Sequence, residues 1–393
     1  MKILFISQLL PLPLDAGPKI RAYYVLRYLA EAGHDVTLLC FTRPSDRAKD
    51  VEDLRKICKA VEIIPLIRSR VKDVADGLHS LFSETPFLVL RDQCAVMKQK
   101  LHQLTKSKSF DAVHSDQLWM SPYVMGAFEG IRTILDQHNA VFMVPQRLAE
   151  YESNWLKKAF LQNEASKLLA FEQATCRAFS HVVWVSEEDR KAVSSVDDGK
   201  TVSSIIPIAT DPSTYPPVKR SSPFRVTFVG GMHWPPNAEG ISWFSQVVWP
   251  QVARAVPFSV LTLIGKGAPK KLRTDNLAQI EIAGYVGDLT KYLSETAVFI
   301  VPLRSGAGMR VKILDAWSWG LPIVSTSLGA EGINISAGED LLIADDAPSF
   351  ADALVRILRD PILASKLSEC GRATVEELYD WKKVYPAWDQ IYR

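Results

Sequence analysis

Residues 301–326 read VPLRSGAGMRVKILDAWSWGLPIVST and contain a complete strand–helix–strand pattern. The apolar run Ala297–Val301 predicts one strand, and Ile323–Ser325 predicts the next. Between them, two glycines mark a turn, and Met309–Trp319 predicts a helix. A helix that joins two short apolar strands is typical of a βαβ unit, which places the two strands parallel in one sheet.

The same alternation extends over the rest of the chain. In the second half, Arg225–Val229 and Phe258–Ile264 predict strands on either side of the helical segment Asn237–Arg254. In the first half the apolar runs are continuous, as in strands that are buried on both faces. There we predict the helix Pro18–Ala32 and the strands Lys2–Ser7, Asp35–Phe41, Val61–Ile67, Ala112–His114, Thr133–Asp136 and His181–Val185. The predicted fold class is α/β, with two doubly wound, Rossmann-like domains facing across a cleft.

The boundary between the two domains is predicted near residue 205. The segment Ile205–Phe224 contains five prolines, three serines and two threonines, which indicates a linker with little to pack. We therefore predict a first domain over 1–205 and a second over 206–374. The segment 375–393 is rich in aromatic residues, and we expect it to form a helix that packs back onto the first domain.

Composition excludes several classes of protein. A chain of 393 residues with a net charge of +2 is too near neutral for a general nucleic-acid binder. Its five cysteines are scattered without a C-x-x-C pair, which favours a reducing compartment over a disulfide framework or a zinc site. The N-terminal apolar run is short and lacks a cleavage site, and no run of 18 apolar residues occurs. We expect a cytoplasmic protein.

Basic residues are concentrated between residues 55 and 108. This stretch contains eleven Lys and Arg residues against five Asp and Glu residues, a net charge of +6. One interpretation is a solvated helical surface. The other is a peripheral contact with anionic lipid at the inner face of the membrane, where basic side chains are attracted to the headgroups. The sequence leaves both open.

The junction after Val301 has the residues of an anion site. Gly306 and Gly308 let the backbone approach a ligand closely, and the following helix begins with unpaired amides and a partial positive charge. Arg310 and Lys312 add two full charges near this helix start, an arrangement that suits a bound diphosphate. Asp315 could accept hydrogen bonds from ribose hydroxyls. The alternative is a solvent-facing basic turn.

Two further strand–helix junctions carry candidate binding residues. Gly230 and Gly231 end one strand, and His233 follows them where it could touch phosphate or sugar. We interpret Asn237 as the N-terminal cap of the next helix. In the first half, Gly17 precedes a helix and His138 follows a strand, where it could donate to a sugar hydroxyl.

Several chemistries lack their motifs. The sequence contains no G-x-G-x-x-G after the first strand and no G-x-x-x-x-G-K-[ST], which argues against a nicotinamide dehydrogenase and a P-loop NTPase. It contains no Asp-x-Asp pair, so we predict no metal site and no cofactor. Ser305 lacks the G-x-S-x-G context of a hydrolase nucleophile.

The second half closely resembles the donor-binding domain of the retaining GT-B glycosyltransferases of family four. The stretches that carry this resemblance are FVGGMHWPPNAEGISWF (228–244), LIGKG (263–267), GYVGDLTKYL (284–293) and residues 301–333. The first half matches more loosely, through Gly17 and Arg21, GHDVTLLC (33–40) and LDQHNAV (135–141). Among the members of the family, the chain looks most like the polysaccharide-building enzymes, such as those of heterocyst envelopes.

The resemblance implies a role for each matching residue. Asp315 stands where the family usually has a glutamate that binds ribose, and Ala307 replaces the partner glutamate eight residues earlier. The usual Arg and Lys after the Gly-Gly strand end are absent, so Arg310 and Lys312 would neutralise the leaving diphosphate. Together with the junction residues, the predicted site comprises the catalytic residues His138, Arg310 and Lys312, the donor-binding residues Gly230, Gly231, His233, Tyr285, Val286, Gly306, Ala307, Gly308, Met309 and Asp315, and the acceptor-binding residues Gly17 and Arg21.

These assignments imply a hexosyltransferase. We expect transfer from a nucleotide-diphosphate sugar, UDP-glucose in the most specific form of the prediction, to a polysaccharide or lipid-linked oligosaccharide, with retention of configuration. The first domain would bind the acceptor and the second the donor. The alternatives are a nucleotide-sugar epimerase of the same fold and a non-catalytic protein that binds sugar nucleotides.

Overall fold

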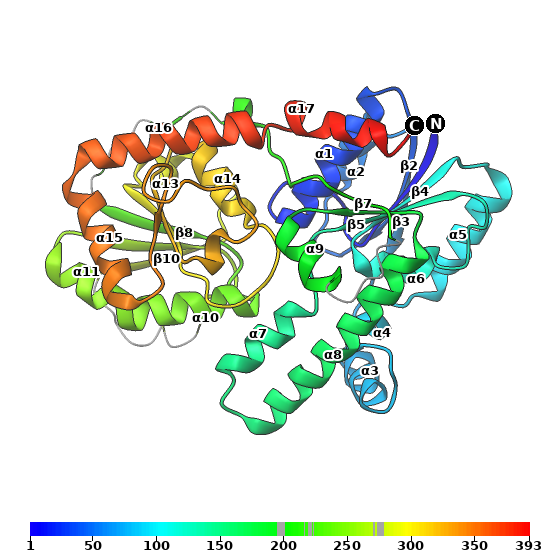
Figure 1. The fold of residues 1–393 in the computed structure, drawn as a ribbon, viewed down its shortest axis with the longest axis horizontal. Helices are drawn as coiled ribbons and strands as arrows, with labels where there is room; N and C mark the ends of the chain where they lie inside the picture. The colour runs from blue at the N-terminus through cyan, green and yellow to red at the C-terminus, as the bar shows by residue number, and fades with distance from the viewer. Residues whose placement is uncertain (195–200, 216, 219–221, 223, 270–271, 273–278) are drawn as a thin grey trace. The chain divides into compact units, whose positions relative to one another are not determined.

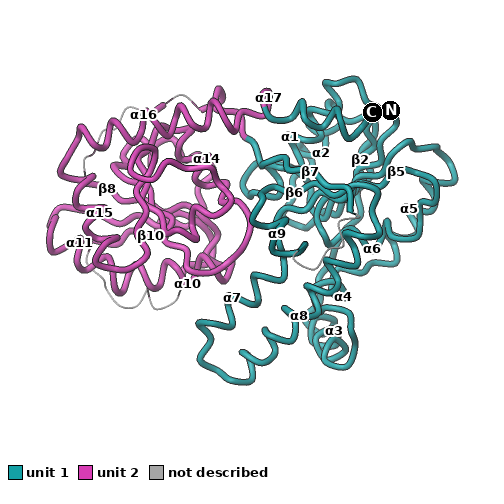
Figure 2. The backbone as a smooth tube through the Cα atoms, viewed as in Figure 1, with its two compact units in different colours: residues 1–209, 384–393 teal, residues 210–383 magenta. Residues whose placement is uncertain are grey.

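The computed structural model describes residues 1–194, 201–215, 217–218, 222, 224–269, 272 and 279–393. The chain forms two compact units, which are coloured separately in Figure 2. The first unit contains Met1–Ala209 and Val384–Arg393, and the second contains Thr210–Lys383.

The first unit is built on a parallel sheet of seven strands in the order β3-β2-β1-β4-β5-β6-β7. Residues of β1 and β2 are almost all buried, because helices cover both faces of a doubly wound sheet. The strands are β1 (Lys2–Ser7), β2 (Asp35–Thr42), β3 (Ala60–Pro65), β4 (Ala112–Asp116), β5 (Arg132–Gln137), β6 (His181–Trp184) and β7 (Ser203–Ile205).

Helices connect these strands, as Figure 1 shows. The first, α1 (Gly17–Glu31), begins with a proline at its second position, where the missing N–H costs no hydrogen bond. The other helices of this unit are α2 (Ala48–Arg55), α3 (Arg70–Phe82), α4 (Phe87–Arg91), α5 (Ala95–Ser107), η1 (Leu118–Met120), α6 (Ser121–Val124), α7 (Met143–Tyr151), α8 (Trp155–Ala178) and α9 (Glu187–Ser194).

The C-terminal residues complete the core of the first unit. The helix α16 (Pro361–Leu378) belongs to the second unit and ends at Leu378, α17 (Trp381–Val384) follows, and η5 (Tyr385–Gln390) lies in the first unit. Tyr385 and Trp388 are fully buried there. The expectation of one helix over 375–393 is therefore wrong, because the chain leaves helical geometry at Tyr379 and Asp380, where Asp380 pairs with Thr210.

The segment between the two sheets is better packed than its composition indicates. Part of the predicted linker Ile205–Phe224 lies outside the described residues. Within the part that is described, Ile206, Ile208 and Thr210 are buried, and η2 (Pro212–Thr214) follows them. The division between the units falls at Ala209, four residues after the predicted boundary.

The second unit has a parallel sheet of six strands in the order β10-β9-β8-β11-β12-β13. Its strands are β8 (Arg225–Val229), β9 (Val260–Ile264), β10 (Ile280–Gly284), β11 (Val298–Val301), β12 (Ile323–Ser325) and β13 (Leu342–Ile343). Its remaining helices are α10 (Pro235–Trp243), η3 (Phe244–Val248), α11 (Trp249–Ala255), α13 (Thr290–Ser294), α14 (Val311–Ser318), η4 (Leu328–Ala330) and α15 (Ala347–Arg359). The predicted α/β class with two Rossmann-like sheets is confirmed. Among the described residues, none of the helices combines the length and apolar character needed to span a bilayer.

Candidate functional site

The carboxyl ends of four adjacent strands in the second unit bring the predicted donor-binding loops together. Because β10, β9, β8 and β11 are parallel neighbours, the loops that follow them leave the same edge of the sheet. In open α/β sheets this edge is where ligands bind. The loops begin at Tyr285, Gly265, Gly230 and Pro302.

Glycine is required where the loops after β8 and β9 meet. A Cβ on Gly265, whose φ is +141°, would lie 2.0 Å from the carbonyl oxygen of Gly230. A Cβ on Gly231 would lie 2.5 Å from the ring of His233. The amide of Met232 donates to the carbonyl of Lys266 at 2.8 Å, which joins the two loops. The loops after β8 and β9 therefore pack against each other more closely than a side chain on Gly265 would allow.

Lys312 connects α14 to the loop after β8. Its Nζ donates to Oδ1 of Asn237 at 3.0 Å, and Nδ2 of Asn237 donates to the carbonyl of Gly231 at 2.9 Å. The ammonium also lies 4.3 Å from the centre of the Phe228 ring. The interpretation of Asn237 as a helix cap is wrong: α10 begins at Pro235 with Trp234 at the cap position, and the Asn237 side chain instead positions Lys312.

Lys312 and Asp315 have shifted pKa values. Burial and the neighbouring Arg310 lower the pKa of Lys312 to about 7, against the opposing effect of Asp315. Burial raises the pKa of Asp315 to about 7, and Lys312 opposes that rise. Charged groups that are desolvated and poorly compensated are typical of sites that receive a charged ligand.

Arg310 braces its own loop. Its side chain is 9% exposed, and the guanidinium donates to the carbonyls of Ala307 and Gly308. Gly306 adopts a φ of +110°, which only glycine tolerates readily, and a Cβ there would lie 3.1 Å from the guanidinium. Arg310 precedes the first residue of α14, so it acts at the helix start through the loop rather than from within the first turn.

The remaining predicted donor residues differ in exposure. Tyr285 and His233 are exposed, Val286 is half-buried, and Met309 is buried. Nζ of Lys266 lies 4.5 Å from the centre of the Tyr285 ring, so a cation and an aromatic face adjoin at the end of β10. A buried Met309 can offer a ligand its backbone but not its side chain.

In the first unit, His138 belongs to a buried charged cluster. Its Nε2 lies 2.9 Å from Oδ1 of Asp116, and Oδ2 of Asp116 accepts from the Ser7 hydroxyl at 2.6 Å. Burial alone would lower the pKa of His138, but Asp116 and Asp136 raise it to about 9. The two carboxylates therefore favour the protonated form of His138, which donates hydrogen bonds.

Arg21 lies inside the same cluster. Its guanidinium donates from Nε and Nη2 to the two oxygens of Asp136, each at 3.0 Å, and from Nη1 to the carbonyl of Pro207 at 2.7 Å. The side chain is fully buried. The prediction that Arg21 binds the acceptor does not fit this position, because its donors are used within the unit. Gly17, the other predicted acceptor residue, is the half-buried first residue of α1.

The carboxylates of this cluster also meet His114. One ligand-capable atom each of His114, Asp116 and Asp136 lies within 4.8 Å of the others. Arg21 donates to both oxygens of Asp136. Burial alone would raise the pKa of this carboxyl, but the charge of Arg21 holds the pKa well below its usual range. Arg21 and His138 thus supply the positive charge that a metal ion would otherwise bring, and the donor set fits an ion-pair network better than a metal centre.

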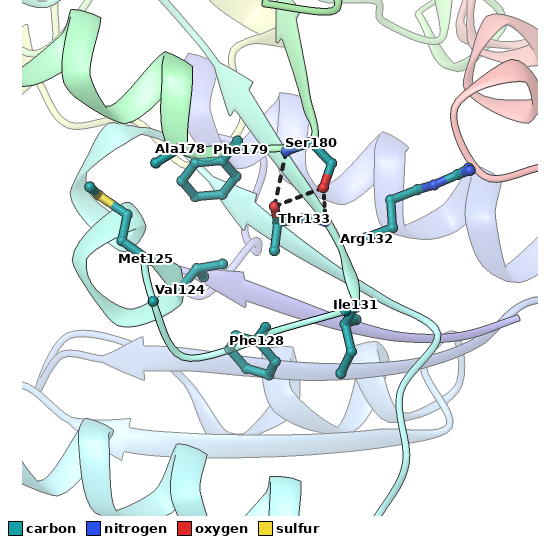
Figure 3. Close-up of a pocket in the computed structure, with 11 residues that line it drawn as sticks. Val124, Met125, Phe128, Ile131, Arg132, Thr133, Ala178, Phe179 and Ser180 are labelled. Carbon is teal, nitrogen blue, oxygen red and sulfur yellow. Dashed lines mark hydrogen bonds between the residues drawn. The ribbon is translucent and has the colours of Figure 1, made fainter.

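A pocket of about 340 Å³ lies elsewhere in the first unit, as Figure 3 shows. It is lined by Arg132 and Thr133, at the start of β5, and by Ser180, just before β6. Thr133 and Ser180 exchange hydrogen bonds there. The pocket therefore opens at the amino ends of the strands, away from the edge that carries the predicted site residues.

Comparison with known families accounts for both sheets. Residues 17–213, half of the chain, match the family model described as Glycosyltransferase Family 4. The chain belongs to glycosyltransferase family 4. Residues 223–360 match the model described as Glycosyl transferases group 1. This family 4 glycosyltransferase thus has one matched region in each unit.

Relatives by sequence include proteins of surface polysaccharides and glycolipids. An "Uncharacterized 44.6 kDa protein in cps region" of Klebsiella pneumoniae is 24% identical over 98% of both chains. The lipopolysaccharide core biosynthesis glycosyltransferase LpsE of Rhizobium meliloti is 30% identical over 36% of this chain and 43% of its own. A phosphatidyl-myo-inositol mannosyltransferase of Mycobacterium leprae is 28% identical over 34% of this chain and 37% of its own.

Solved structures show the same fold. Sucrose-phosphate synthase of Thermosynechococcus elongatus has a TM-score of 0.72 at 19% identity, over 100% of this chain and 98% of its own. Anabaena HepE, in complex with UDP and glucose, has a TM-score of 0.70 at 13% identity, over 100% and 99%. The glycosyltransferase therefore has the GT-B α/β fold.

Three residues that contact or adjoin predicted site residues, one in the first unit and two in the second, were not predicted in these roles. Asp116 was missed because the strand was predicted to end at His114, two residues early. Lys266 lies in the quoted LIGKG stretch, and its position directly after a strand was the available signal. Asn237 was recognised but given a capping role, and no feature of the sequence indicates its contact with Lys312.

Proposed function

We propose that this family 4 glycosyltransferase transfers a hexose from a nucleotide-diphosphate sugar to a polysaccharide or a lipid-linked oligosaccharide, with retention of configuration. The specific donor that we propose is UDP-glucose. We further propose that the protein works in the cytoplasm, where it uses nucleotide sugars as substrates. We also propose that the reaction needs no metal and no cofactor.

One observation carries the donor proposal. Lys312 and Arg310 lie beside the loops that contain Gly230, Gly231 and Gly306, at the carboxyl edge of the second sheet. A diphosphate fits such a place, because backbone amides at a helix start and cations both stabilise its charge. The solved neighbour HepE binds UDP and glucose, which supports a nucleotide-sugar donor for this chain as well.

The same residues could promote sugar transfer. Glycosyl transfer passes through an oxocarbenium-like state while negative charge develops on the leaving phosphate. Preorganised positive groups lower the free energy of that state. Lys312 would supply the charge directly, and Arg310 would hold the 306–308 loop against the donor. Asp315 would accept from the ribose, and the face of Tyr285 would contact the base.

The relatives support the acceptor class. LpsE acts in lipopolysaccharide core biosynthesis, and the mannosyltransferase is named for a phosphatidylinositol acceptor. Acceptors of this kind are attached to lipid, so we propose that the protein meets its acceptor at the inner face of the membrane.

A thermal-shift panel of UDP, GDP, ADP and their sugar conjugates tests the donor site. A ligand at about 100 times its Kd stabilises a protein by about 2.7 kcal/mol, which gives a clear shift. We expect one diphosphate to shift the wild type and to lose most of that shift in Lys312→Gln. An unchanged melting temperature with every nucleotide would rule out the proposed site.

The second candidate is a non-catalytic sugar-nucleotide binder, which Ala307 favours because the family usually has a glutamate there. Incubation of the donor with and without acceptor saccharides separates the possibilities. Product that requires acceptor supports transfer, interconversion of the donor alone indicates an epimerase, and binding without turnover indicates the binder.

A further inference from the structure

The helix α3 (Arg70–Phe82) exposes its apolar face. Val71 is 80% exposed, Leu78 is 57% exposed and Phe82 is 90% exposed, and Val74 and Leu81 are exposed as well. These residues follow the i, i+3, i+7 spacing of one helix face. Ile67, just before the helix, is 81% exposed. Large apolar side chains gathered in this way mark a surface that another body covers.

The polar face of α3 points into its own unit. Ser80 is fully buried, and its hydroxyl donates to Glu164 of α8. Asp76 pairs with Lys72 at 2.6 Å, and Lys72 Nζ also donates to the carbonyl of Arg91 in α4 at 3.1 Å. Figure 1 shows α3 at the edge of the first unit, beside α4 and α8. An ordinary surface helix packs its apolar face against the core and exposes its polar face. In α3 the polar face is packed and the apolar face is exposed.

The charges around this face indicate what covers it. Both acidic residues of α3, Asp73 and Asp76, are only partly exposed and lie on the inward side, whereas Arg70 is exposed. Asp92 is buried and pairs with Arg68. The surrounding stretch 55–108 has eleven basic and five acidic residues. An exposed apolar helix face in a stretch of the chain with net positive charge fits an anionic lipid bilayer, where the apolar side chains enter the headgroup–acyl boundary.

We infer that α3 is a bilayer-docking helix, which lies in the interface of a membrane containing anionic lipid with Val71, Val74, Leu78, Leu81 and Phe82 in contact with the acyl chains. This surface is separate from the proposed donor site. Its test needs neither donor nor turnover, so its failure and that of the proposed function can be told apart.

Vesicle flotation of the full chain tests the inference. The vesicles are phosphatidylcholine alone, or phosphatidylcholine mixed with phosphatidylglycerol. The variant Leu78→Glu/Phe82→Glu adds two charges to the apolar face. The matched control Phe258→Glu/Ile362→Glu adds the same charges at sites of the second unit that are 80% and 81% exposed. Because all four side chains are exposed, both variants should fold, which thermal melting checks.

We expect the wild type and the control to float with the anionic vesicles, and the α3 variant to lose at least about tenfold in binding. Neutral vesicles should bind the wild type more weakly, because the basic surroundings no longer contribute. Absence of wild-type binding to anionic vesicles, or equal loss in both double variants, would overturn the inference. So would a dimer that the α3 variant alone dissociates without any vesicle binding, because the apolar face would then belong to a second copy of the chain.

Discussion

At the scale of single residues, the two units differ in the hydrogen-bond partners of their buried cationic side chains. In the first unit, Arg21 is matched to Asp136 through two hydrogen bonds, and His138 is held against Asp116. In the second unit, Lys312 has a neutral amide as its hydrogen-bond partner, and its pKa falls to about 7. When a buried charge has a matched partner, removal of that partner strongly destabilises the fold. A desolvated charge without a charged hydrogen-bond partner is instead stabilised when a ligand of opposite charge binds.

Donor affinity should therefore depend on pH through Lys312. The donor diphosphate favours the protonated ammonium, so affinity should be highest below about pH 7 and fall as the pH rises above it. Calorimetric titration with a nucleotide-diphosphate sugar between about pH 6 and pH 8.5 should show a loss of roughly threefold to tenfold. In Lys312→Gln, affinity should be lower throughout and should fall less across this range, where only the ionisation of Asp315 remains to weaken binding. A wild-type profile that stays flat would contradict the pKa shift as a determinant of binding.

Arg21 should act on stability and not on acceptor binding. Arg21→Met leaves Asp136 buried without its partner, and breaking such a pair costs about 3–5 kcal/mol. Denaturant unfolding should show this loss. The double variant Arg21→Met/Asp136→Asn removes both charges and should regain a substantial part of it. A raised KM for the acceptor with unchanged unfolding free energy would instead restore the acceptor-binding role.

At the scale of elements, the loop 305–310 and α14 form one functional piece. Arg310 donates to the carbonyls of Ala307 and Gly308, and Gly306 supplies the positive φ. The helix α14 carries Lys312 at its second position and Asp315 three residues later. The loop conformation and the position of the charges therefore depend on each other.

Two substitutions of Arg310 should distinguish the effect of its charge from the effect of its hydrogen bonds to the 307–308 carbonyls. We expect Arg310→Ala to lower the transfer rate by about 10²–10³, the usual effect of removing a preorganised electrostatic partner. Arg310→Lys retains the charge but loses the planar guanidinium that reaches two carbonyls, so it should recover only part of the rate. Full recovery with lysine would mean that charge alone matters. A loss of less than threefold in the alanine variant would contradict the proposed role.

Most elements could be predicted because continuous apolar runs identify strands that are buried on both faces. Lys2–Ser7, Arg225–Val229 and Ile323–Ser325 were predicted with the bounds that the structure has. The strands β7, β10 and β13 were missed. Two are sheet edges of only two or three residues, and β10 contains Glu281 and ends in two small residues, which weakens the apolar signal.

The candidate site could be predicted only as far as single junctions allow. Glycines after strands identified the loops at Gly230 and Gly306, because a parallel sheet collects such loops at one edge. Contacts between distant junctions could not be predicted, since Asn237 and Lys312 are 75 positions apart in the sequence and no local pattern connects them. For the same reason the pairing of Arg21 with Asp136, across 115 residues, was not foreseen.

At the scale of the whole molecule, the two units are not simple sequence halves. The chain builds the first sheet, then the second unit, and returns with Val384–Arg393 to the first unit. Tyr385 OH accepts from Arg21 Nη1, and Tyr392 OH lies 2.6 Å from His114 Nδ1. Trp388 lies under the guanidinium of Arg21, 5.0 Å from it. The last ten residues therefore cover the charged cluster.

In a chain truncated after Lys383, the first unit should unfold while the second unit stays folded. Removing one large buried aromatic side chain costs about 3–5 kcal/mol of unfolding free energy. The loss of buried Tyr385, Trp388 and Tyr392 together would therefore cancel most or all of the roughly 5–15 kcal/mol that stabilises a typical domain. Hydrogen exchange should show loss of protection in β1–β6 and retained protection in β8–β13. Tyr392→Phe, which removes only one hydroxyl, should keep both. Equal protection of β1–β6 in the truncated and full chains would contradict this dependence.

The return of the C-terminus also sets an order of events on the ribosome. Met1–Ala209 is synthesised before the second unit, yet the aromatic residues that cover Arg21 and Asp136 are translated only after it. N-terminal domains usually finish folding while the rest of the chain is being made. Here the first unit can complete its core only after the second unit has been synthesised, so until then the nascent chain should leave its earlier half open to chaperones and proteases.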